Sequence, residues 1–210
     1  SEGMGLDVVS GGELYAARKA GFPMDRVWFH GNAKTRDEIL LAVDYRVGRV
    51  VVDNLDELAL LDRAAREKGV RMPILFRVNP GVDPHTHQYI STGQVDSKFG
   101  MPLDPSVWDE YMGRALRMEG VELLGFHFHV GSQLFSAEPH LKAAGKVLDL
   151  MREARDRYGF LARELNVGGG FGVRYTAEDE PLPVQDFTDA VMAEVAARCR
   201  EYSLPMPRVV

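Results

Sequence analysis

Residues 9–21 read VSGGELYAARKAG, and this stretch decides between two ways of arranging a parallel sheet. It joins an apolar, strand-like segment at residues 5–9 to a helix-like segment at residues 11–20. In open sheets that bind nucleotides, a glycine pattern of the form GxGxxG or GxxxxGK usually follows the first strand. Neither pattern is present here. The sequence therefore favours a (β/α) barrel over an open doubly wound sheet.

Short apolar runs alternate with amphipathic runs along the rest of the chain, as in βα units around a parallel sheet. The predicted fold class is α/β, a (β/α)8 TIM-type barrel with seven of its eight strands and six helices between them. The strands are expected near residues 5–9, 26–30, 49–52, 73–79, 121–130, 164–168 and 208–210. The helices are expected near residues 11–20, 36–45, 55–68, 105–118, 137–158 and 184–202.

Local signals support individual elements. Asn54 is a predicted N-cap for the third helix, with Glu57 as its reciprocal partner and Gly69 as the stop. The irregular stretch at residues 79–104 is longer than the roughly 2–6 residues of an ordinary βα loop, which is typical of functional loops.

Composition narrows the function classes. The 210 residues carry a formal net charge of −6, and the basic residues are scattered, which argues against nucleic-acid binding. Cys199 is the single cysteine, so no intrachain disulfide can form, and no apolar run approaches the ~20 residues that span a bilayer. We expect a cytoplasmic protein with small-molecule partners. Because Ser1 lies just before a strand and MPRVV ends within an apolar run, we also expect an excised piece.

Polar and glycine residues follow five of the predicted strands, and barrel enzymes build their active sites at such strand ends. The most informative is VGGGFG at residues 167–172. Three successive glycines leave backbone N–H groups open to a phosphate, although a tight structural turn has the same composition. Ser132, on the preceding strand end, is a natural second phosphate donor.

The stretch GFHFHVGSQ at residues 125–133 carries His127 and His129, which allow three interpretations. They could bind zinc together with His85 and His87, they could be buried core residues, or a ring could stack on a flat cofactor. Beside a glycine phosphate cradle, the third interpretation indicates a planar, phosphorylated cofactor.

Five stretches together resemble the diaminopimelate decarboxylases, pyridoxal-phosphate enzymes of the alanine-racemase-like barrel class. They are GLDVVSGGEL, FHGNAKT, FRVNPGVDPHTHQYISTGQVDSKFG, GFHFHVGSQ and LNVGGGFGVRY. The HTHQYISTGQVDSKFG segment separates this family from the ornithine and arginine decarboxylases. The resemblance implies pyridoxal 5'-phosphate as cofactor and conversion of meso-2,6-diaminopimelate to L-lysine and CO2, the last step of lysine biosynthesis. It also implies a homodimer for the intact enzyme.

The resemblance also implies roles for individual residues, and it implies no metal ligand. His129 matches the histidine that stacks on the cofactor ring, and Asp7 and Arg77 match polar residues near that ring. The phosphate binders are matched by Ser132, Gly168, Gly169 and Gly170, with Gly170 foremost.

Other family features have no match here. The Schiff-base lysine of the first strand, the Glu-Pro-Gly-Arg turn and the C-terminal β domain with its catalytic cysteine are absent, and Cys199 is not that cysteine. Lys98 matches a lysine at the subunit interface. Residues 1–210 are thus expected to form a partial pyridoxal-phosphate-binding barrel that is inactive alone. An ornithine- or arginine-type decarboxylase, a non-catalytic pyridoxal-phosphate-binding barrel and a metal hydrolase are the alternatives.

Overall fold

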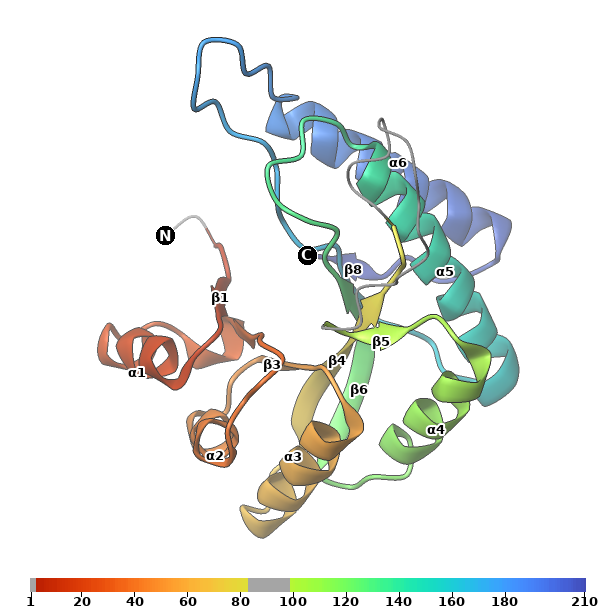
Figure 1. Cartoon of the computed structure of the whole chain (residues 1–210). Helices are drawn as coiled ribbons and strands as arrows, with labels where there is room; N and C mark the ends of the chain where they lie inside the picture. Colours follow the sequence, from red (N-terminus) through yellow and green to blue (C-terminus); the bar gives the residue numbers. More distant parts are fainter. Residues whose placement is uncertain (1–2, 83–98) are drawn as a thin grey trace. The chain divides into compact units, whose positions relative to one another are not determined.

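The computed structural model describes residues 3–82 and 99–210 (Figure 1). The chain divides into two compact units, the first made of Ser1–Arg77 and Lys98–Gly125 and the second of Val78–Ser97 and Phe126–Val210. Strands β4 and β6 each begin in the first unit and end in the second.

The first unit alternates short strands with helices along the chain. Its elements are β1 (Leu6–Val8), α1 (Gly11–Lys19), the 3-10 helix η1 (Met24–Arg26), β2 (Val27–Phe29), α2 (Arg36–Tyr45), β3 (Arg49–Val52), α3 (Leu55–Glu67), β4 (Met72–Asn79), β5 (Met101–Pro102), α4 (Pro105–Ala115) and β6 (Val121–Phe128).

The second unit continues the alternation from the end of β6. Its elements are α5 (Glu138–Tyr158), β7 (Glu164–Asn166), α6 (Val184–Glu201) and β8 (Arg208–Val209). Helices α5 and α6 lie side by side (Figure 1). None of the helices in the described ranges combines the length and the apolar character needed to cross a membrane.

The strands follow one another in space as they do along the chain. The order is β1-β2-β3-β4-β6-β7-β8, and the pairs β1/β2, β2/β3, β3/β4 and β7/β8 are parallel. A doubly wound sheet reverses its strand order at a switch point, whereas a barrel does not. The predicted barrel-type fold class, with seven strands and intervening helices, is therefore confirmed. Strand β5, which pairs with β4, was not predicted.

Apolar strands and helix faces form the core, as the alternation predicts. All three residues of β2 are buried, as are Val50–Val52 of β3 and Leu58, Leu61 and Ala65 of α3. The strands hold the ends of βα loops at fixed positions.

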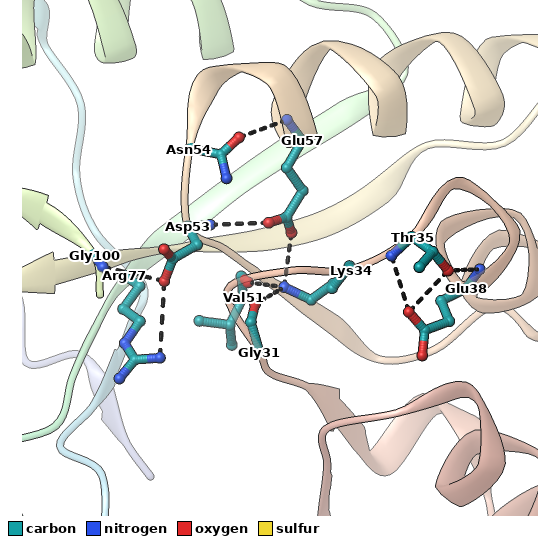
Figure 2. Close-up of polar contacts among 10 residues, drawn as sticks. All are labelled: Gly31, Lys34, Thr35, Glu38, Val51, Asp53, Asn54, Glu57, Arg77 and Gly100. Atoms are coloured by element: carbon teal, nitrogen blue, oxygen red, sulfur yellow. Dashed lines mark hydrogen bonds and ion pairs between the residues drawn. The ribbon is translucent and has the colours of Figure 1, made fainter. Parts of the chain in front are cut away.

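The cap of α3 differs from the prediction in one respect, and α2 has a cap that was not predicted. Asn54 does cap α3, since its Oδ1 accepts from the Glu57 N–H at 2.9 Å, and Gly69 ends the helix with φ of 63°. The prediction that Glu57 binds the Asn54 N–H is wrong, because Glu57 Oε1 binds the buried ammonium of Lys34 and Oε2 accepts from the Asp53 N–H. A complete capping box occurs in α2, where Thr35 and Glu38 bind each other's backbone N–H groups (Figure 2).

Candidate cofactor site

The glycine run after β7 is held by three hydrogen bonds within the second unit. The Gly168 N–H donates to Asn166 Oδ1 at 2.9 Å, and the Gly170 carbonyl accepts from the Leu134 N–H at 2.9 Å. Between them, the Gly169 carbonyl lies 3.2 Å from His140 Nε2. A carbonyl only accepts, so His140 Nε2 carries the proton. The backbone of this glycine loop, residues 168–170, is thereby fixed at successive peptides.

These contacts leave two donors of the loop available. Within residues 3–82 and 99–210, the N–H groups of Gly169 and Gly170 donate to no acceptor. A trans peptide directs its N–H opposite to its carbonyl, so the Gly170 N–H points away from His140. Adjacent unpaired N–H groups in a glycine turn form a concavity that binds anions. The loop therefore has the donors that a phosphate requires.

The same loop needs glycine for steric reasons. Gly168 and Gly170 have φ of 70° and 99°, a region that other residues rarely adopt. A Cβ on Gly170 would overlap the Gly131 carbonyl, and a Cβ on Gly168 would lie 2.5 Å from the Phe128 carbonyl oxygen. A Cβ on Gly169 would meet nothing within 4 Å. The loop is thus packed against residues 128–132 on one side and open beside Gly169, which suits a bound phosphate group.

Ser132 and His129 lie on the segment against which the loop packs. A Cβ on Gly170 would lie 3.3 Å from Ser132 Cα, and a Cβ on Gly168 would lie 3.1 Å from His129 Nδ1. Both side chains are exposed. The structure thus brings together all five residues predicted to contact the cofactor in this unit.

His127 and His129 differ in their surroundings. Strand β6 ends at Phe128, so His127 lies within the strand and is 3% exposed, while His129 follows it and is exposed. For His127, the core interpretation fits. His85, His87 and Lys98 lie outside the described residues, and within the described ranges no three His, Cys, Asp or Glu side chains group as metal ligands.

Asp7 and Arg77 belong to the first unit and lie at two different strand ends. Asp7 is in β1, where its exposed carboxylate oxygen Oδ1 lies 3.3 Å from His30 Nε2. Arg77 is near the end of β4, and its Nη1 lies 3.7 Å from Asp53 Oδ1. Burial lowers the pKa of Arg77, and the negative charge of Asp53 opposes this effect. The two predicted residues therefore have separate partners.

Lys34 lies in the loop between β2 and α2, and its side chain is buried. Its ammonium donates to the carbonyls of Gly31 and Val51 at 2.6 and 2.7 Å and to Glu57 Oε1 at 2.7 Å (Figure 2). Burial lowers its pKa, and the charge of Glu57 raises it. The ammonium therefore already has three acceptors in this fold.

Comparison with known proteins places the chain in a family. The family model for the pyridoxal binding domain of pyridoxal-dependent decarboxylases matches residues 1–210. The chain belongs to this family. The diaminopimelate decarboxylase of Bacillus subtilis is 45% identical over 208 residues, which is 99% of this chain and 47% of that protein.

Solved structures agree with the family assignment. A crystal structure of diaminopimelate decarboxylase from M. jannaschii has a TM-score of 0.88 and 34% identity, over 98% of this chain and 46% of the other. A second structure of that enzyme, in complex with L-lysine, has a TM-score of 0.86 and 34% identity, over 97% of this chain and 46% of the other. The chain spans about half the length of the relatives that it matches.

Sequence reasoning missed two residues of this pyridoxal binding domain, Asn166 and His140. Asn166 had a usable signal, because an Asn two residues before a glycine commonly accepts that residue's N–H in an Asx turn. His140 had none. It lies in α5, 29 residues before the carbonyl that it binds, and only the packing of α5 against the β7 end brings them together.

Proposed function

We propose that this chain is the cofactor-binding part of a diaminopimelate decarboxylase, which converts meso-2,6-diaminopimelate to L-lysine and CO2 with pyridoxal 5'-phosphate. The observation that carries the proposal is the glycine loop, whose two available N–H groups and open side beside Gly169 suit a phosphate. The identity to diaminopimelate decarboxylases over nearly the whole chain supports the substrate.

In this proposal the second unit holds the cofactor phosphate. The N–H groups of Gly169 and Gly170 donate to phosphate oxygens, and the Ser132 hydroxyl adds a third donor. Gly168 contributes by its conformation, since its own N–H is already bound to Asn166. The anion is thus held mainly by backbone dipoles, which need no reorganisation when it binds.

The exposed ring of His129 would stack on the cofactor ring and orient it. The bound cofactor supplies an electron sink for the electron pair left when CO2 departs. The protein's contribution is orientation, exclusion of water and charge at fixed positions. Asp7 and Arg77 are assigned to the surroundings of the ring, where the guanidinium is a permanent cation and the carboxylate an acceptor.

The proposal extends to the setting of the enzyme. Lysine as product places the reaction at the end of lysine biosynthesis, and an acidic protein with one buried cysteine suits the reducing cytoplasm. For the complete enzyme we propose a homodimer with Lys98 at the subunit interface.

The decisive experiment measures cofactor content and substrate choice together. The protein in its natural full length is loaded with pyridoxal phosphate and assayed for CO2 release from meso-diaminopimelate, L-ornithine and L-arginine. We expect stoichiometric cofactor and turnover of diaminopimelate alone. If ornithine or arginine is turned over preferentially, the proposed substrate is wrong and the enzyme is an ornithine- or arginine-type decarboxylase. If the protein binds the cofactor but releases no CO2 from any of the three, it is a non-catalytic pyridoxal-phosphate-binding protein. Stoichiometric zinc without pyridoxal phosphate would overturn the proposal entirely.

Two variants separate ring orientation from phosphate binding. His129→Ala removes the ring contact but leaves the glycine loop, so turnover should fall more than cofactor affinity. Gly170→Ala crowds the loop against Gly131, so cofactor affinity should fall more than turnover of the loaded enzyme. Wild-type turnover and cofactor content in both variants would refute these assignments.

A further inference from the structure

Arg77 belongs to a buried cluster of charged side chains that the cofactor assignments leave unexplained. We define the Arg77 cluster as Lys34, Asp53, Glu57 and Arg77, all in the first unit (Figure 2). The side chains of Lys34, Glu57 and Asp53 are 1%, 4% and 8% exposed, and that of Arg77 is 15% exposed. Four charged groups with so little exposure are rare in proteins unless they are paired.

The cluster is a connected chain of contacts that ends on Arg77. Lys34 binds Glu57 Oε1, and Glu57 Oε2 accepts from the backbone N–H of Asp53 at 3.3 Å. Asp53 Oδ1 then lies 3.7 Å from Arg77 Nη1 and accepts from the Gly100 N–H at 3.1 Å. The contacts therefore connect the β2–α2 loop, the end of β3 and the end of β4.

The charges of the cluster balance. Two cations, Lys34 and Arg77, face two carboxylates, Glu57 and Asp53. Burial raises the pKa of both carboxylates and lowers that of both cations, and in each group the opposite charges of the cluster counteract the shift. Removal of one member would leave a buried charge without compensation.

Arg77 is also held from a second direction. Its guanidinium carbon lies 4.6 Å from the centroid of the Phe99 ring, in a cation–π contact. Phe99 adjoins Gly100, whose N–H binds Asp53. The Asp53 carboxylate thus contacts the Arg77 guanidinium directly and also holds the backbone next to Phe99, whose ring contacts the same guanidinium. A long, flexible arginine side chain is restricted by these two contacts to few orientations.

We propose that Asp53 is a positioning residue for Arg77, which orients the guanidinium for the decarboxylase site through its carboxylate and through the Phe99–Gly100 backbone. This inference rests on the proposed function of the chain and adds a residue that does not itself contact the cofactor. Lys34 and Glu57 support it by fixing the backbone N–H of Asp53. A neutral side-chain oxygen at position 53 could still accept from the Gly100 N–H, but it would not attract the Arg77 guanidinium. The proposed role therefore depends on the negative charge of Asp53.

The test uses Asp53→Asn, which keeps an oxygen for the Gly100 N–H and removes the charge that faces Arg77. The matched control is Asp62→Asn. Asp62 is an equally buried carboxylate that accepts from a glycine N–H, that of Gly120 at 2.8 Å, and pairs with Arg66 at 3.0 Å. It lies in α3 and holds the residue before β6, at the opposite ends of the strands from Asp53. Both variants remove the charge of a buried carboxylate that binds a glycine N–H, although Arg66 is 53% exposed and Arg77 is 15% exposed.

We expect Asp53→Asn to lower kcat by about 10- to 100-fold in the full-length cofactor-loaded enzyme, as misplacement of a site residue does. Asp62→Asn should lower stability too but leave kcat within roughly twofold, because Asp62 lies at the other ends of the strands and shares no partner with Arg77. In an Arg77→Gln background, Asp53→Asn should change kcat no further. A kcat loss in that background as large as in the wild type would show that Asp53 does not act through Arg77.

A second measurement does not depend on decarboxylation. Phenylglyoxal modification of Arg77, mapped by mass spectrometry, should be faster in Asp53→Asn than in the wild type and unchanged in Asp62→Asn. Equal rates in all three proteins would overturn the positioning role even if the wild type is an active decarboxylase. Faster modification in a protein that releases no CO2 would retain the positioning of Arg77 and refute only the proposed function.

Discussion

Burial of His140 makes the stability of the second unit depend on pH. The ring is 0% exposed and lies among aromatic rings, with centroid distances of 4.7 Å to Phe187, 6.1 Å to Phe171 and 6.4 Å to Phe128. Its Nε2 binds the Gly169 carbonyl, and its buried Nδ1 has no hydrogen-bond partner within the described ranges. A second proton on this ring would therefore be a charged donor without an acceptor.

Burial accordingly lowers the pKa of His140 from 6.5 to about 4; the carbonyl of Gly169 opposes this shift, and the nearby His129 adds to it. Because the unfolded chain takes up the proton first as pH falls, folding loses stability from about pH 6.5 down to about pH 4. The full loss is about 3 kcal/mol at 1.36 kcal/mol per pKa unit. Between pH 7 and pH 5 it amounts to about 2 kcal/mol.

The assay is urea unfolding of the wild type and of His140→Phe at pH 7, 6 and 5. Phe keeps an apolar ring in the aromatic cluster and removes the titration. We expect the wild type to lose about 2 kcal/mol more than His140→Phe between pH 7 and pH 5. His129→Ala removes only the smallest of the three causes of this shift, so most of the pH dependence that His140 confers should remain. Parallel curves for the wild type and His140→Phe would refute the reasoning.

Two further predictions concern stability at pH 7. Gly170→Ala should lower the free energy of unfolding by about 2–5 kcal/mol, because the residue has a left-handed backbone and its Cβ would overlap Gly131. Gly159→Ala, where φ is 66° and the space is open, should lower it by only about 1–2 kcal/mol. Equal losses in thermal unfolding would contradict the packing of the loop. Lys34→Met should cost about 3–5 kcal/mol because it leaves the Glu57 carboxylate buried alone, and Lys34→Met combined with Glu57→Leu should recover part of this loss. Lys68→Ala removes an exposed ion pair and should change stability little, so an equally small change for Lys34→Met in urea unfolding would show that the buried pair contributes little.

Local sequence patterns predicted the elements of this fold and several of its caps. The predicted helix at residues 36–45 and the strand at residues 49–52 match the structure at both ends, and most other boundaries differ by one or two residues. Periodicity and capping are properties of neighbouring residues, so they can be read without knowing the fold. Strand β5 was missed because two residues in a long irregular stretch carry no periodicity.

The glycine loop shows how far the same reasoning reaches into the site. Three glycines after a strand indicated an anion cradle, and the packing of Gly170 against the Ser132 segment agrees with that geometry. The cofactor roles of these residues stay predictions. The sequence could not show that His140 holds the loop, because it lies in a distant helix, whereas the spacing of Asn166 before Gly168 was a local signal that could have been used.

By itself, the sequence determined the alternation of strands and helices, the position of the glycines and the family to which the chain belongs. The tertiary structure decided which charged groups pair. Glu57 had the spacing of a reciprocal helix cap, but a buried ammonium 23 residues earlier in the chain binds its carboxylate. A buried Lys34 without that carboxylate would be far costlier than an incomplete helix cap, since the unpaired charge loses its hydration while the cap loses one exposed hydrogen bond.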